Sequence, residues 1–334
     1  MDTCCLGRIL DLAFDPRMPQ SFTTRMLRAR KLRQIMKHAQ PPTETRTVFL
    51  VLTFDVESEY GSHRVGGNGV AASQFLGNIQ NVSENMTIFV QGSLVQQNSE
   101  ILRSLERQGI EIGLHGYRHE LWGPAQWYLA DRPLTLQEKK SLLEAGMEAF
   151  RAAGLRSPAI FRSPNLVADT STLQLLAEKG FRVDSSLPSH RGLLPVPVFF
   201  GGPEGLIRIP VTVDPTPSLS RKGLLPYYRY LVFDLKNLKE MKTGELLQHV
   251  SRIVVLQETL GFLPHLVILC HSWEFLNQSA EEWDYCCPAN FEFLRNLDSI
   301  LSENFSVRHV SMSTLAEQFK GNKTDAVSSC SVLE

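Results

Sequence analysis

The sequence lacks the features that mark several large classes of protein. It has no run of about 20 apolar residues, so no transmembrane helix is predicted. Its first residues are acidic where a secretory signal needs basic ones, and Arg8 and Asp11 interrupt the apolar stretch, so no signal peptide is predicted. Neither charge is in excess, with 34 Lys and Arg against 35 Asp and Glu, and nothing global suggests a nucleic-acid binder. The six cysteines form no CxxC pair, which argues against a disulfide framework or a zinc finger and favours a reducing, cytoplasmic compartment.

What is present is an ordinary globular composition preceded by a basic segment. The 334 residues, 43% of them hydrophobic, suffice for one large α/β domain or two smaller ones. Residues 1–45 are expected to form a basic extension and linker. Within them, residues 17–38 could lie as an amphipathic helix on the anionic inner face of a membrane, or pack on the domain as a solvated helix. Both interpretations stay open, and we expect a cytoplasmic protein with possible peripheral membrane contact.

From residue 46 onward, apolar β-branched runs alternate with amphipathic helical patterns that end in glycine. This alternation predicts a parallel sheet, open or closed into a barrel, and seven or eight such units favour the barrel. The tail, residues 320–334, is polar and expected to be flexible. The Pro- and Gly-rich segment 186–242 is expected either to form a substrate-cleft loop or to pack on the barrel edge. The predicted strands are 47–54, 86–90, 110–115, 158–162, 181–184, 206–211, 266–270 and 307–310, and the helical patterns are 93–109, 135–154, 169–180 and 243–261.

Two groups of polar residues that follow predicted strands suggest a metal site. Asp55 and Glu57 are two residues apart at a strand end and therefore point to the same face. Two neighbouring carboxylates repel each other unless a cation lies between them or one is protonated. His115 and His119 follow another strand at a spacing typical of metal ligands. Two histidines and one carboxylate make a site that leaves coordination positions open for water and substrate.

Three more strand ends carry polar residues suited to hydrolysis. Arg162 could orient one of the carboxylates through a charge-assisted contact. Asp184 ends another strand. His271 ends the last long apolar strand, with Trp273 two residues further on, and is a candidate general acid or base. Each residue alone fits a structural role equally well, but all five groups lie where α/β sheets and barrels build active sites.

The series TFDVE (53–57), HGYRH (115–119), FRSPN (161–165), VDSS (183–186) and CHSWEF (270–275) resembles the five motifs of the polysaccharide deacetylases. This family is also called the NodB-homology domain or carbohydrate esterase family 4. The resemblance covers residues 46–319 and implies a catalytic domain with a distorted, incompletely closed (β/α)7-type barrel. EIGLHGYRHELW and LIRIPVT look similar to the branch that acts on lipid-linked amino sugars.

The resemblance implies a metal site and a base. His115 and His119 match the family's metal-binding histidines. Asp55 matches the catalytic base of the first motif, whose commonest form has two adjacent Asp residues. Here Val56 stands at the second position, and by the acid-x-acid form of the motif Glu57 becomes the metal ligand. Because of this departure, the roles of Asp55 and Glu57 could be exchanged.

The resemblance also implies roles for the later motifs. Arg162 is expected to hold the base. His271 is expected to be the general acid, and Asp184 to keep it protonated. The backbone N–H near Asn165 is expected to stabilise the oxyanion. Substrate contacts are expected at Pro164, Asn165 and Trp273, with Trp273 as the apolar wall of the acyl pocket.

These assignments predict a metal-dependent hydrolase that removes an acetyl or formyl group from an N-acylated amino sugar. No nucleic-acid partner is expected. The expected cofactor is a divalent metal, with zinc favoured and other divalent ions open. Two alternatives remain, an amidase acting on a small linear or cyclic amide and an inactive carbohydrate-binding relative. A non-haem iron oxygenase also uses two His and one carboxylate, but such enzymes usually have all-β scaffolds, which the alternating pattern disfavours.

Overall fold

The computed structural model describes residues 45–58, 70–83, 85–126, 129–187, 195–201, 205–222, 225–277 and 284–321. Residues 1–44 of the expected basic extension lie outside the described residues. The expected membrane-contact segment 17–38 belongs to this part. The expected tail lies outside the described residues from residue 322, while Lys320 and Gly321 still belong to the last helix. None of the described helices is both long and apolar enough to cross a bilayer.

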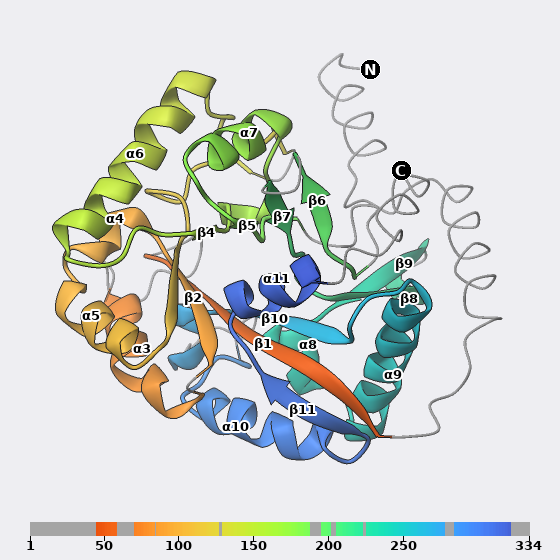
Figure 1. Cartoon of the computed structure of the whole chain (residues 1–334). Helices are drawn as coiled ribbons and strands as arrows, with labels where there is room; N and C mark the ends of the chain where they lie inside the picture. The colour runs from red at the N-terminus through yellow and green to blue at the C-terminus, as the bar shows by residue number, and fades with distance from the viewer. Residues whose placement is uncertain are drawn as a thin grey trace.

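The described elements alternate between strands and helices, as the sequence pattern predicts (Figure 1). The strands are β1 Arg46–Val56, β2 Met86–Val90, β3 Glu111–Leu114, β4 Ile160–Phe161, β5 Val183–Asp184, β6 Val198–Phe200, β7 Leu206–Arg208, β8 Val213–Lys222, β9 Leu225–Val232, β10 His265–His271 and β11 Phe305–His309. The helices are α3 Val70–Asn78, η1 Ile79–Asn81, α4 Gly92–Val95, α5 Ser99–Arg107, α6 Leu136–Ala152, η2 Pro164–Leu166, α7 Thr170–Glu178, α8 Leu235–Glu240, α9 Thr243–Thr259, η4 Ser272–Phe275, α10 Asn290–Leu301 and α11 Met312–Gly321.

The main sheet has the order β10-β1-β2-β3-β4-β5-β7-β6, and β11 pairs with the first half of β1. The pairs are parallel except at the edge, where β6 runs antiparallel to β7. The chain that leaves β7 returns to the other end of the sheet, because Thr212 N donates to the carbonyl of Val267 (3.0 Å) and Val267 N donates to Thr212 Oγ1 (2.8 Å). The result is the curled, incompletely closed α/β barrel that the sequence predicts.

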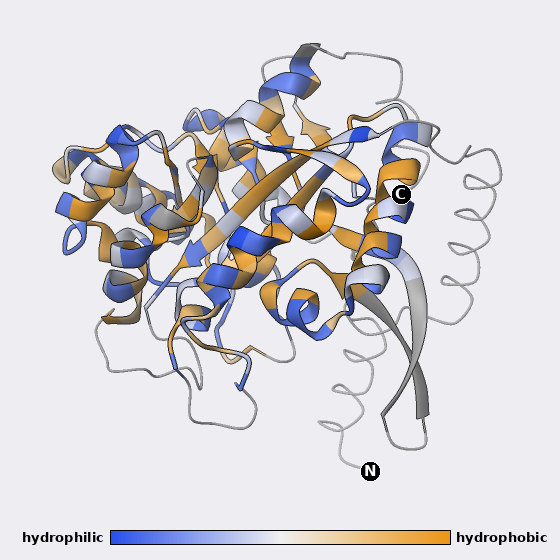
Figure 2. Ribbon diagram, turned by 90° about the horizontal axis from the view of Figure 1, so that it is seen from below, coloured by the Kyte–Doolittle hydropathy of each residue, from blue (hydrophilic) through white to orange (hydrophobic). Residues whose placement is uncertain are grey.

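Strand β1 shows why these apolar runs become central strands. Its residues from Val48 to Val56 are all buried, which is typical of a parallel strand covered on both faces. Alternate residues enter two different cores. Val48 and Leu50 face the outer helices, whereas Phe49 and Val51 face the barrel interior. Figure 2 shows the resulting apolar centre, with hydrophilic residues on the outward faces of the helices.

Helix α11 covers one mouth of the barrel. Its residues Leu315 and Phe319 join the interior core. The first turn of the helix is held at the beginnings of two strands, because Met312 N donates to Thr87 Oγ1 (2.9 Å) and Ser313 N donates to the carboxylate of Glu111 (3.2 Å). The opposite mouth, where the parallel strands end, is therefore where polar side chains can gather.

The segment 186–242 is neither a simple loop nor only an edge. Its described part contains β6 and β7 at the sheet edge, the antiparallel pair β8–β9, and helix α8. The single helix expected over 93–109 is two helices, α4 and α5, with Asn98 between them donating its side-chain amide to the carbonyl of Leu94 (2.9 Å).

An ion pair between a buried lysine and a partly exposed aspartate joins the outer helices α6 and α7 and gives a stability prediction. Lys139 is 1% exposed, and its ammonium donates to both carboxylate oxygens of Asp169 (2.6 and 2.7 Å). Asp169 also caps α7 by accepting from Thr172 N (2.9 Å). Removing the carboxylate leaves a buried cation without its partner and a helix without its cap. We expect Asp169→Ala to lower the free energy of unfolding by about 2–4 kcal/mol in denaturant titration.

The same pair predicts a pH dependence. Burial alone would raise the pKa of Asp169, but Lys139 and the cap outweigh it and lower the pKa to about 2. A lowered folded-state pKa stabilises the protein above the unfolded pKa and loses that effect as the pH falls. The difference in stability between wild type and Asp169→Ala should therefore shrink between about pH 4 and pH 2. A difference that is constant over this range would contradict the assignment.

Candidate metal centre

The predicted site residues gather at the ends of neighbouring parallel strands. Asp55 lies at the end of β1 and pairs in register with His271 at the end of β10. His115 directly follows β3, and Arg162 directly follows β4. Within β1, side chains alternate, so Asp55 lies on the interior face that Phe49 and Val51 define. This is the mouth opposite α11, where α/β barrels place their functional residues.

Glu57, His115 and His119 converge in the way the sequence predicts. One ligand atom from each lies within 4.8 Å of the others. Glu57 Oε2 is 2.8 Å from His119 Nε2 and 3.6 Å from His115 Nε2. Glu57 and His115 are buried, and the side chain of His119 is 11% exposed. Two imidazole nitrogens and one carboxylate oxygen therefore face a common point.

The orientation of His115 is fixed by the neighbouring strand. Its Nδ1–H donates to the carbonyl oxygen of Arg162 (3.0 Å). A proton on Nδ1 leaves the lone pair on Nε2, which is the atom that faces Glu57. This arrangement, in which the far nitrogen of a ligand histidine bonds to a carbonyl, is common at metal sites and sets the tautomer.

A tight loop brings His119 back over the strand end. His119 and Gly116 both have positive φ, 70° and 61°, a conformation that histidine adopts less readily than glycine. Glu120 holds the loop closed by accepting from the backbone N–H groups of Tyr117 (3.0 Å) and Arg118 (2.7 Å). The left-handed residue at 119 is thus built into the turn that places the ligand.

Electrostatics at the centre favour a positive charge between these groups. Burial would raise the pKa of Glu57, but His119 and His115 outweigh it and hold that pKa well below 4.5. Burial would lower the pKa of His119, but Glu57 raises it. Glu57 Oε2 is buried and has no well-directed hydrogen bond among the described residues. The donor set, its burial and this carboxylate oxygen fit a divalent cation.

Arg162 fixes Asp55 beside the three converging residues Glu57, His115 and His119. The guanidinium donates to Asp55 Oδ1 (2.7 Å), to Thr53 Oγ1 (2.9 Å) and to Ser185 Oγ (2.9 Å). Arg162 is fully buried and lies over the ring of Phe89. With Oδ1 engaged, Asp55 presents Oδ2, which is 3.8 Å from His115 Nε2. The roles of Asp55 as the base and Glu57 as the ligand stay predictions.

Trp273 contacts both halves of the site. Its indole N–H donates to Glu57 Oε1 (2.9 Å), and its ring stacks on His271 with centroids 4.8 Å apart. The sequence predicts Trp273 as the wall of an acyl pocket, and that role stays a prediction. The hydrogen bond adds a second role, because it fixes the Glu57 carboxylate with Oε2 toward the two histidines.

The expected pairing of Asp184 with His271 is not made. One oxygen of Asp184 accepts from Ser186, and the other from Arg208 Nε (3.0 Å). In the two-residue strand β5, Val183 faces the interior core, so Asp184 points to the other face. The carboxylate beside His271 is that of Glu274, whose Oε2 lies 3.6 Å from His271 Nδ1. The sequence contains this residue in CHSWEF, but the resemblance assigns it no role.

Pro164 and Asn165 form the short helix η2, which follows Arg162. Asn165 has a left-handed backbone, φ 59°, and Ser163 N donates to Ser186 Oγ (2.8 Å). The helix is therefore anchored to the strand beside it. The oxyanion and substrate contacts of these two residues stay predictions.

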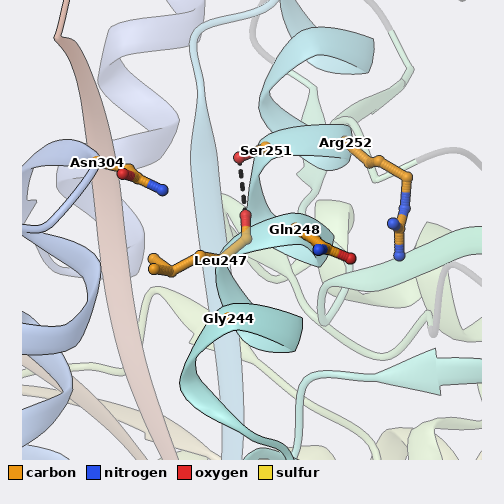
Figure 3. Close-up of a pocket in the computed structure, with 6 residues that line it drawn as sticks. All are labelled: Gly244, Leu247, Gln248, Ser251, Arg252 and Asn304. Atoms are coloured by element: carbon orange, nitrogen blue, oxygen red, sulfur yellow. Dashed lines mark hydrogen bonds between the residues drawn. The ribbon is translucent and has the colours of Figure 1, made fainter.

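A separate hollow of about 420 Å³ lies along α9 (Figure 3). It is lined by residues of α9 and by Asn304, which follows α10. The α9 residues are Gly244, Leu247, Gln248, Ser251 and Arg252. Ser251 Oγ donates a hydrogen bond to the carbonyl of Leu247 (2.7 Å). None of the three converging residues lines this hollow.

The structure is an α/β half-barrel in which two histidines and one carboxylate converge. Comparisons with known proteins agree with this fold. The family model described as polysaccharide deacetylase matches residues 43–183. A peptidoglycan deacetylase-like protein of Gibberella zeae is 28% identical over 109 residues, which are 33% of this chain and 30% of that protein's length. Residues 43–183 are thus similar to the polysaccharide deacetylases, and this segment contains the first three of the five motifs.

Solved structures show the same fold over a longer part of the chain. A structure from Mycobacterium smegmatis assigned to the polysaccharide deacetylases has 22% identity and a TM-score of 0.54, covering 85% of this chain and 94% of its own. One from Pseudomonas aeruginosa with the same assignment has 16% identity and a TM-score of 0.54, covering 84% and 92%. The half-barrel extends beyond the matched family segment and includes β10 with His271.

Proposed function

We propose that this protein is a metal-dependent hydrolase that removes an N-acyl group, acetyl or formyl, from an amino sugar of a glycan or lipid-linked saccharide. One observation carries the proposal. Glu57, His115 and His119 converge at the strand ends, directly beside the Arg162-held Asp55 and within one strand of His271. The match to the polysaccharide deacetylase model supports the same class of substrate.

The residues that would hold the metal are Glu57, His115 and His119. A divalent ion at such a site supplies Lewis acidity, which makes water a better nucleophile and an amide carbonyl a better electrophile. Zinc suits this mixed nitrogen and oxygen donor set, and other divalent ions also bind such sites.

Asp55 accepts a proton from the attacking water. Because Arg162 holds Oδ1, the free oxygen Oδ2 is the one that takes the proton. The ion pair also keeps the carboxylate oriented without a conformational change during the reaction. A positioned base of this kind contributes roughly 10²–10⁴-fold to a rate.

His271 donates a proton to the departing amine, since an amide anion is a poor leaving group. Burial alone would lower the pKa of His271, but Glu274, Glu57 and Asp55 raise it to about 9. The residue is therefore protonated at neutral pH and able to act as an acid. Its side chain is 25% exposed, so a substrate can reach it.

Product analysis with the metal-loaded full chain tests the proposal. The substrates are N-acetylated and N-formylated amino sugars, supplied free, in oligosaccharides and on a lipid carrier, together with small linear and cyclic amides. We expect acetate or formate release from an amino-sugar substrate that stops on chelation and returns with a divalent metal. Ammonia or ring-opened product from the small amides alone would favour the amidase alternative. Binding of sugars without turnover would favour an inactive relative.

A further inference from the structure

The proton-donating His271 needs a carboxylate that stabilises its charged ring. The expected carboxylate, Asp184, points away from it. Asp184 is engaged by Ser186 and Arg208. His271 Nδ1 is buried and makes no well-directed hydrogen bond among the described residues, and Glu274 Oε2 lies 3.6 Å from it. The imidazole ring is stacked on Trp273, which restricts its rotation. One edge of the ring therefore faces Glu274, and the Nε2 edge faces away from it.

Glu274 is itself fixed in place. It is 2% exposed, and its Oε2 accepts from the backbone N–H of His271 (2.7 Å). Its own carbonyl accepts from Asn290 Nδ2 (2.7 Å) and from Cys287 N (3.1 Å), which ties η4 to the beginning of α10. The short helix η4 thus turns the Glu274 side chain back onto the residue three positions earlier.

The charges around Glu274 leave His271 as its partner. Within 4 Å, the described Lys, Arg and His residues include no cationic partner for Glu274 other than His271. Tyr285, whose hydroxyl donates weakly to Glu274 Oε1 (3.5 Å), is neutral. A buried carboxylate without a compensating positive charge is costly, so protonated His271 and ionised Glu274 stabilise each other.

We propose that Glu274 is a positioning residue that holds a proton on Nδ1 of His271 and aims Nε2–H at the departing amine. This inference rests on the proposed function for its consequence in catalysis, but the arrangement of the pair can be measured without turnover. The groups that face His271 are Glu274 on η4, Asp55 and Glu57 on and after β1, and His119 on the loop after β3. Of these, Glu274 is the one within reach of Nδ1.

The test compares Glu274→Gln with wild type in the metal-loaded full chain. Glutamine keeps the size of the side chain and can still accept from His271 N, but it removes the charge. Glu240→Gln, at an exposed carboxylate at the end of α8, is the matched control. The rate should fall in wild type at alkaline pH, as His271 loses its proton. In Glu274→Gln this fall should occur at least one pH unit lower, which means about a tenfold lower kcat on the alkaline side of the wild-type profile with KM unchanged.

Glu274→Asp keeps the charge and should return the fall in rate toward the wild-type pH. Metal content should match wild type in all variants, because Glu274 is not a ligand. Superimposable pH profiles for wild type and Glu274→Gln would overturn the proposal. If Glu274→Gln fails to fold, Glu274→Asp decides. Its shorter carboxylate lies further from Nδ1 and should still move the fall in rate below the wild-type pH, whereas a purely structural role predicts no change in the pH profile of a folded variant.

NMR titration of the His271 ring, assigned with a His271→Gln variant, keeps this inference separate from the proposed function. We expect the ring of wild type to lose its proton at higher pH than that of Glu274→Gln or Glu274→Asp, with the larger difference for Gln. Equal titration in wild type and Glu274→Gln overturns the role of Glu274 even if the enzyme is active. Absence of acyl release with a shifted titration contradicts the proposed function and leaves the Glu274–His271 pair in place.

Discussion

Replacing His115 with alanine is expected to remove both the bound metal and the hydrolytic activity. His115 supplies one of three converging ligand atoms, and its Nδ1–H is committed to the carbonyl of Arg162. Two remaining ligands, one of them on a loop with a left-handed residue, cannot replace this preset nitrogen. Metal analysis after extensive dialysis should find wild type loaded and His115→Ala empty, with acyl release falling to background.

His249→Ala is the matched control for this experiment. His249 lies on α9 and contacts Asp214 (2.6 Å). The substitution therefore removes an imidazole from the same chain but none of the candidate metal ligands. It should retain metal and turnover. Full metal occupancy in a folded His115→Ala protein would contradict the ligand assignment, and circular dichroism melting shows whether the variant is folded.

Asp55→Asn is expected to lower kcat by roughly 10²–10⁴-fold while the metal stays bound. The amide cannot take the proton of the attacking water, but Glu57, His115 and His119 remain in place. Arg162 is fully buried, so loss of its anionic partner should also lower stability, and the assay belongs well below the melting transition. The measurement is kcat together with metal content per chain.

Glu57→Gln serves as the contrasting variant, because the two carboxylates are close in sequence and separate in role. It should lose metal, whereas Asp55→Asn should keep it. The opposite result, with metal lost from Asp55→Asn and kept by Glu57→Gln, would show that the base and the ligand are exchanged. Activity retained by Asp55→Asn would remove the base assignment altogether.

The pattern of apolar runs predicts most of the fold because a doubly covered parallel strand needs continuous apolar residues. This holds for β1 and β10, whose ends then place Asp55 and His271 side by side. The HxxxH spacing predicts the second part of the centre, since a strand end followed by a closed turn brings two imidazoles together. These inferences depend on local periodicity and on strand ends, both of which are visible in the sequence.

The predictions from the sequence are wrong or incomplete where the chain reverses direction within a few residues. A two-residue strand such as β5 gives no periodic signal, so the face occupied by Asp184 could not be predicted from alternation. The turn η4 directs Glu274 back to His271, and no apolar pattern marks such a turn. The antiparallel edge strand β6 and the split between α4 and α5 depend on tertiary contacts that a sequence does not display.

The most direct test of the account is anomalous diffraction from crystals of the full chain loaded with zinc, with data collected on both sides of the zinc edge. We predict one strong peak within coordination distance, about 2.0–2.2 Å, of Glu57 Oε2, His115 Nε2 and His119 Nε2. A metal-loaded crystal with no peak there, or with its peak on other residues, would contradict the metal centre on which the proposed hydrolysis depends.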